Sequence, residues 1–110
     1  MINTEKKTIE INDILVSRFG YNCTLVNFYK VLSKTSSGKS VKIIRLKNKI
    51  INDDGYGQAG EVVASSENDG NNVLTKRILK TKNNDECLSI DSYEYAYLWD
   101  GKPVYFDSYD

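Results

Sequence analysis

A chain of 110 residues with zero formal net charge and 40% hydrophobic residues has the size and composition of one folded domain, which we expect to span residues 1–110. It contains no histidine and no CxxC motif, which excludes zinc sites built on Cys and His and catalysis by a histidine base. No run approaches the roughly 18 apolar residues of a membrane span, and Met1 to Asn12 lacks the apolar core of a secretory signal, so we expect a cytoplasmic protein without membrane association.

Clusters of Gly, Asn, Asp and Ser interrupt the chain at short intervals and predict tight turns, among them a loop at Asn68 to Asn72. The intervening segments are rich in Val, Ile, Leu, Tyr and Thr and are predicted strands: 14–17, 24–32, 40–47, 61–64, 73–80, 87–90 and 104–106. Many short strands joined by tight turns favour a mainly β fold with at most one short helix, built as a small curled antiparallel sheet or barrel.

The two predicted strands 24–32 and 40–47 are expected to form a hairpin through the turn at 36–38. Val41 and Ile43 share one register and Ile44 and Leu46 the opposite one, which a β-bulge near Ile43 would reconcile. The second strand carries a basic run: Lys39, Lys42, Arg45, Lys47 and Lys49. Such a run is typical of a track for nucleic-acid phosphates, although zero net charge is unusual for that function.

Charge is segregated along the chain. Between Ile14 and Asn52 there are eight basic residues and no acidic one, whereas from Asn83 to Asp110 seven acids stand against Lys102 alone. Adjacent acids in Asn- and Gly-rich segments are typical of solvated turns, and no calcium-loop pattern is present. We therefore expect no metal, no cofactor and no catalytic residues. In a cytoplasmic protein, we expect Cys23 and Cys87 to be small core residues and not partners in a disulfide.

Residues 91–106 hold half of the aromatic side chains of the chain. As a strand, this segment places Tyr93, Tyr95, Tyr97 and Trp99 on one face and Glu94, Ala96 and Leu98 on the other. As a short helix, which the capping residues favour slightly, it begins at Asp91 and ends before Gly101. One interpretation gives Ala96, Leu98 and Trp99 to the core. The other makes an acidic aromatic binding face from Tyr93, Glu94, Tyr95, Tyr97, Asp100 and Asp107.

The string LWDGKPVYF at 98–106, together with the SxxGYxxTxxxFYKV pattern at 17–31, resembles a group of small uncharacterised proteins of bacteriophages and mobile elements. The resemblance implies a bacterial host cell as the setting but no activity. The leading hypothesis is a non-catalytic protein-binding module, such as an anti-CRISPR-like inhibitor whose acidic aromatic face mimics DNA toward a host defence nuclease. The alternative is a small β-barrel that binds nucleic acid through the basic run. The residues leave the oligomeric state and the identity of the partner open.

Overall fold

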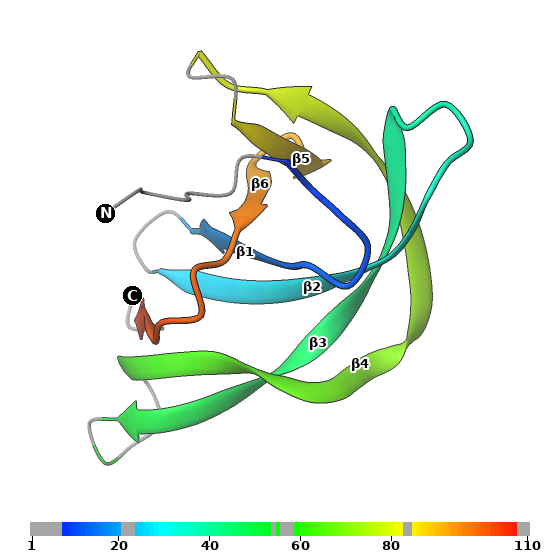
Figure 1. Ribbon diagram of the computed structural model, residues 1–110. Helices are drawn as coiled ribbons and strands as arrows, with labels where there is room; N and C mark the ends of the chain where they lie inside the picture. The colour runs from blue at the N-terminus through cyan, green and yellow to red at the C-terminus, as the bar shows by residue number, and fades with distance from the viewer. Residues whose placement is uncertain (1–7, 21–23, 54, 56–58, 83–84, 108–110) are drawn as a thin grey trace, which may run out of the picture.

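The computed structural model describes residues 8–20, 24–53, 55, 59–82 and 85–107 (Figure 1). They form one antiparallel sheet whose strands are β1 (Ile14–Phe19), β2 (Leu25–Lys34), β3 (Ser40–Asp53), β4 (Ala59–Lys80), β5 (Glu86–Asp91), β6 (Glu94–Leu98) and β7 (Val104–Asp107). No described segment is a helix long and apolar enough to cross a membrane.

The first six strands close into a ring. Each of β1 to β5 pairs antiparallel with the next strand in the chain, and β6 pairs back onto β1. Figure 1 shows this ring with β3 and β4 curving around one side. The expected small curled antiparallel sheet or barrel is therefore confirmed. The hairpin through 36–38 is also confirmed, with the Thr35 amide donating to the Ser40 carbonyl at 2.9 Å.

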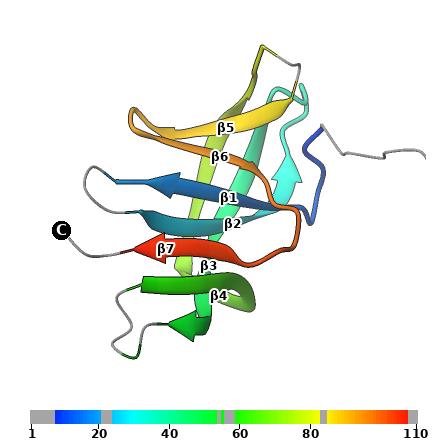
Figure 2. The same cartoon turned by 90° about the vertical axis from the view of Figure 1, so that its left-hand side faces the viewer.

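A second layer lies on the outside of the ring. The long strands β3 and β4 continue past it as a ribbon, and β7 pairs with the start of β4. Two backbone hydrogen bonds between Thr24 and Asp107 tie β7 to the beginning of β2 (Figure 2). The ring interior is filled by a core that includes Leu15, Val31 and Leu88, and the space under the ribbon by a second core that includes Phe28 and Val62.

The helix favoured for residues 91–101 is wrong, because Glu94–Leu98 is strand β6. This strand pairs with β1 on one side and β5 on the other, so a helix here would leave both neighbours with unpaired backbone groups. The capping residues act in turns instead: the Asp91 carboxylate accepts from the Ser92 amide at 2.7 Å. The strand alternative was correct, and tyrosine suits a strand well.

Two further expectations need correction. The loop predicted at Asn68 to Asn72 lies inside β4, as a register shift between the pairs Ile44↔Val73 and Leu46↔Asn68. The bulge predicted near Ile43 lies on the partner strand, where the register shifts between Val31 and Ser33. Neighbouring β3 positions are buried on both faces because β3 passes from the first core to the second.

Candidate functional site

The aromatic groove is a hollow with a volume of about 510 Å³ on the outer face of β1 and β6. The outward-facing positions of β6 supply Tyr95 and Tyr97, and Tyr105 on β7 also lines the groove. These three residues are 42%, 47% and 56% exposed, so their rings form an aromatic patch that is open to solvent. The remaining lining residues are Val16, Arg18, Leu98, Trp99, Asp100, Lys102, Pro103 and Val104.

A fixed turn forms one wall of the groove. The Trp99 amide donates to the Ile14 carbonyl at 3.0 Å, and its indole Nε1 donates to the Lys102 carbonyl at 2.8 Å. The Asp100 carboxylate accepts from the Lys102 amide at 2.9 Å. The Trp99 ring packs edge-to-face on Phe28 with centroids 5.0 Å apart, which anchors the wall in the second core. The groove is therefore held open by hydrogen bonds and packing already present in the free protein.

The charge of the groove is mixed. Arg18 and Lys102 contribute cations, and Asp100 contributes an anion whose carboxylate is engaged by the backbone of the turn. Such a surface offers aromatic contact area with a polar rim, the usual composition of a protein interface. The acidic face predicted from the sequence is not present in that form.

The structure brings together three of the six predicted partner-binding residues: Tyr95, Tyr97 and Asp100 line the groove. Tyr93 is 67% exposed beside Phe19 but does not line it. Asp107 is half-buried at the end of β7, where its backbone pairs with Thr24. Glu94 was wrongly placed on a binding face, because its side chain is buried inside the ring.

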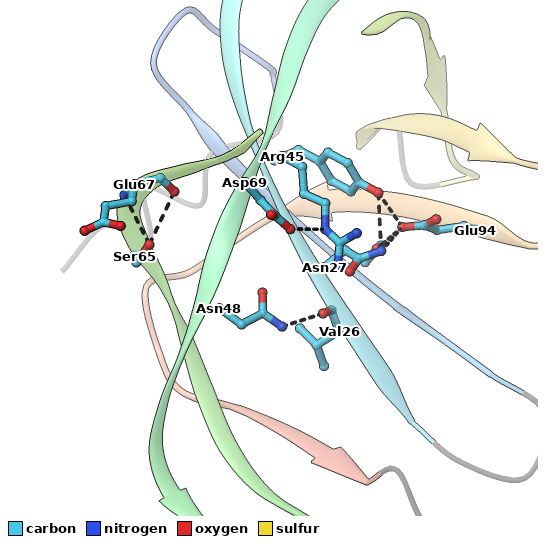
Figure 3. A network of polar contacts seen from close by, with 10 residues as sticks. Val26, Asn27, Arg45, Asn48, Ser65, Glu67, Asp69 and Glu94 are labelled. Atoms are coloured by element: carbon cyan, nitrogen blue, oxygen red, sulfur yellow. Dashed lines mark hydrogen bonds and ion pairs between the residues drawn. The ribbon is translucent and has the colours of Figure 1, made fainter. Parts of the chain in front are cut away.

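Glu94 is the centre of a buried polar network. Its Oε2 accepts hydrogen bonds from the Ser17 hydroxyl at 2.5 Å, the Tyr29 hydroxyl at 2.8 Å and the Asn27 amide at 3.1 Å. Burial, reinforced by the hydrogen bond to Glu94, raises the pKa of Tyr29 above that of an exposed tyrosine. Figure 3 shows the Glu94 and Asn27 side chains pointing toward each other from β6 and β2. These groups satisfy one another, so the network is accounted for as a structural element of the barrel.

The basic run does not form one track. Val41 and Ile43 face the first core, so Lys42 between them points to the opposite side from Arg45. Two members form exposed ion pairs with acids of β4: Arg45 pairs through its Nε with Asp69, and Lys47 pairs with Glu67, each at 3.5 Å. The other members, Lys39, Lys42 and Lys49, are exposed.

The described residues contain no group of three or more His, Cys, Asp or Glu side chains placed to hold a metal ion. Cys87 is a buried free thiol, and burial raises its pKa. Cys23 lies outside the described residues.

No family model matches the chain, and comparisons with curated proteins and with solved structures found no significant match.

Proposed function

We propose that this chain is a non-catalytic binding module that holds a protein partner in the aromatic groove. The observation that carries the proposal is the convergence of Tyr95, Tyr97 and Tyr105 on one preformed concave surface. Tyrosine anchors protein interfaces because it provides large contact area and a hydroxyl at low cost in side-chain entropy. A rigid groove also lowers the ordering cost of binding.

The absence of histidine in the sequence and the composition of the groove support a binding role over catalysis. The ionisable groups at the groove are Arg18, Lys102, Asp100 and tyrosines, and the Asp100 carboxylate already caps a turn. No base is paired there with a nucleophile in the way that covalent catalysis needs.

The partner in this proposal is a host defence protein, such as a CRISPR effector nuclease, that the chain inhibits by covering a functional surface. This identity rests on the resemblance of residues 17–31 and 98–106 to phage and mobile-element proteins. Because Glu94 is buried, Asp100 and Asp107 are the predicted acids left to mimic DNA phosphates at the interface. The cations Arg18 and Lys102 in the groove carry the opposite charge. Aromatic contact therefore has a larger part in binding than mimicry of phosphates.

The test is affinity capture from bacterial host extract with the wild-type chain and the double variant Tyr95→Ser, Tyr97→Ser. Tyr93→Ser is the matched control, because Tyr93 is an exposed tyrosine outside the groove. We expect a protein that is retained by the wild type and the control but lost with the double variant, whose fold is checked by circular dichroism. Equal retention by all three proteins would remove the groove as the binding site.

A nucleic-acid interface on the basic run is the weaker alternative, because its cations are divided between two faces and two of them are paired with acids. It predicts binding that weakens steeply with salt and whose salt dependence flattens in Lys42→Gln and Lys49→Gln. Fluorescence anisotropy with labelled single-stranded and duplex DNA and RNA at low salt measures this directly. We expect no binding there, and a steep salt dependence carried by these two lysines would favour the alternative.

A further inference from the structure

A gap opens between β2 and β3 near the beginning of β2. The ladder between the two strands ends at the pair Phe28↔Leu46, and residues 25–27 continue along β1 without a β3 partner among the described residues. The Asn48 side chain crosses the gap and donates to the Val26 carbonyl at 2.8 Å (Figure 3). This side-chain bond takes the place of a backbone bond and leaves the strands apart.

The Arg45 pocket is the cavity of about 360 Å³ in this gap. Its apolar walls include Leu25, Val62 and Phe106, and its polar lining consists of Arg45, Asn27 and Asn48. A cavity of this size with apolar walls and a few converging polar groups has the usual make-up of a small-molecule site. It is separate from the aromatic groove, with which it shares no lining residue.

Arg45 brings unused hydrogen-bonding capacity to this pocket. Its Nε lies 3.5 Å from the Asp69 carboxylate, and its two terminal NH₂ groups have no hydrogen-bond partner among the described residues. A guanidinium has five N–H donors in a planar fork that fits a carboxylate with two parallel bonds. Figure 3 shows the guanidinium pointing toward the Asp69 carboxylate, to which a dashed line joins its Nε. Asn27 lines the same pocket. The side chain is 48% exposed, so a ligand can reach it from solvent.

We propose that the Arg45 pocket binds a small organic carboxylate with an apolar body. The guanidinium fork holds the carboxylate, the Asn27 and Asn48 amides border it, and the apolar body replaces water against Leu25, Val62 and Phe106. The positive charge disfavours a cation, and the apolar walls favour a carboxylate with a hydrocarbon group over a phosphate ion. The site does not depend on the protein partner of the aromatic groove.

The experiment is a ¹⁵N–¹H NMR titration of the whole chain with 4-phenylbutyrate, and with 4-phenylbutyramide as a neutral counterpart of the same shape. We expect saturable shifts of the Asn27 and Asn48 side-chain amides and of the backbone around residues 25–27 and 48–50. The amide counterpart should bind about tenfold more weakly or worse, because it lacks the charge that strengthens both bonds to Arg45. Shifts centred elsewhere, or equal affinity for the two compounds, would overturn the proposal.

Two substitutions of Arg45 measure its contribution to the affinity for 4-phenylbutyrate. Arg45→Gln should weaken 4-phenylbutyrate binding about tenfold or more, and Arg45→Lys should fall between this variant and the wild type because it keeps the charge but loses the fork. Lys47→Gln is the matched control, since Lys47 has an ion pair of the same 3.5 Å length with β4 but does not line the pocket. Unchanged affinity in both Arg45 variants, or an equal loss in the Lys47 variant, would contradict the assignment.

A carboxylate of this kind can belong to a free small molecule or to the C-terminus of a peptide chain. A peptide ending in phenylalanine distinguishes these two sources. If only the free small molecule shifts the Asn27 and Asn48 amides, the site serves a metabolite-sized acid, as we expect from a pocket of 360 Å³. If the peptide with a free C-terminus binds as well and its C-terminally amidated form does not, the ligand is a chain terminus, and the proposed small molecule is replaced by it.

Discussion

Replacement of the buried Glu94 by glutamine tests whether the polar network holds the barrel together. Glu94→Gln keeps the shape and one acceptor oxygen, but it removes the charge from three hydrogen bonds of 2.5, 2.8 and 3.1 Å. Net contributions are about 1.5–3 kcal/mol for a hydrogen bond to a charged group and about 0.5–1.5 for a neutral one. The loss is therefore about 1 kcal/mol per bond and about 3 kcal/mol in total, a large part of the roughly 5–15 kcal/mol expected for a small domain.

Urea unfolding followed by fluorescence measures this loss, because Trp99 is the single tryptophan of the chain. With a slope of about 1–3 kcal/mol per molar urea, the midpoint should fall by about 1–3 M while the slope stays unchanged. Glu67→Gln is the control: Glu67 is exposed and its pair with Lys47 is 3.5 Å long, so its loss should cost less than about 0.5 kcal/mol. If Glu94→Gln also cost less than about 0.5 kcal/mol, the network would not stabilise the fold as reasoned.

Three further predictions concern stability. Because the pKa of Tyr29 is raised in the folded state, the contribution of Tyr29 to the free energy of unfolding is complete below about pH 10 and is lost as the pH rises further. The free energy of unfolding, measured from about pH 8 to 11, should therefore decline less steeply in Tyr29→Phe than in the wild type. Gly60→Ala would place a Cβ against the Asn52 carbonyl oxygen and should lower the free energy of unfolding, measured in urea, by more than about 2 kcal/mol, against about 1 kcal/mol for Gly70→Ala, whose site is open. Trp99→Phe keeps an aromatic ring but removes the indole hydrogen bond of the groove wall, and should lower the free energy of unfolding by about 1 kcal/mol.

The strands were largely predictable because their signals are local: alternation, β-branched residues and turn residues. The errors arose where pairing overrides these signals. Residues 61–64 and 73–80 form one strand because β3 runs beside both, and Gly70 and its polar neighbours are accommodated as a bulge. The choice between helix and strand for 94–98 depended on β1, which lies far away in the sequence.

The candidate site was predictable only in part. Alternation along a strand places Tyr95 and Tyr97 together and Glu94 on the opposite face, so the strand interpretation already separated the acid from the tyrosines. Arg18 and Tyr105 could not be assigned to the groove without the order of the strands. Ser17 and Asn27 did carry a signal, since they are polar positions on the inward faces of strands that are otherwise apolar there.

The two faces of β6 allow effects on binding to be separated from effects on stability, because even-numbered and odd-numbered residues point to opposite sides of the strand. Glu94 and Ala96 face the ring interior, whereas Tyr95 and Tyr97 face the groove. Substitutions at the even positions should therefore lower stability, and substitutions of the two tyrosines should lower partner capture while the urea midpoint stays close to that of the wild type. Urea unfolding of Tyr95→Ser, Tyr97→Ser beside the capture experiment checks this separation. If partner capture instead decreased in proportion to the loss of stability, for substitutions at the even positions and of the tyrosines alike, the groove would act only by supporting the fold. The partner would then have to be sought on another surface.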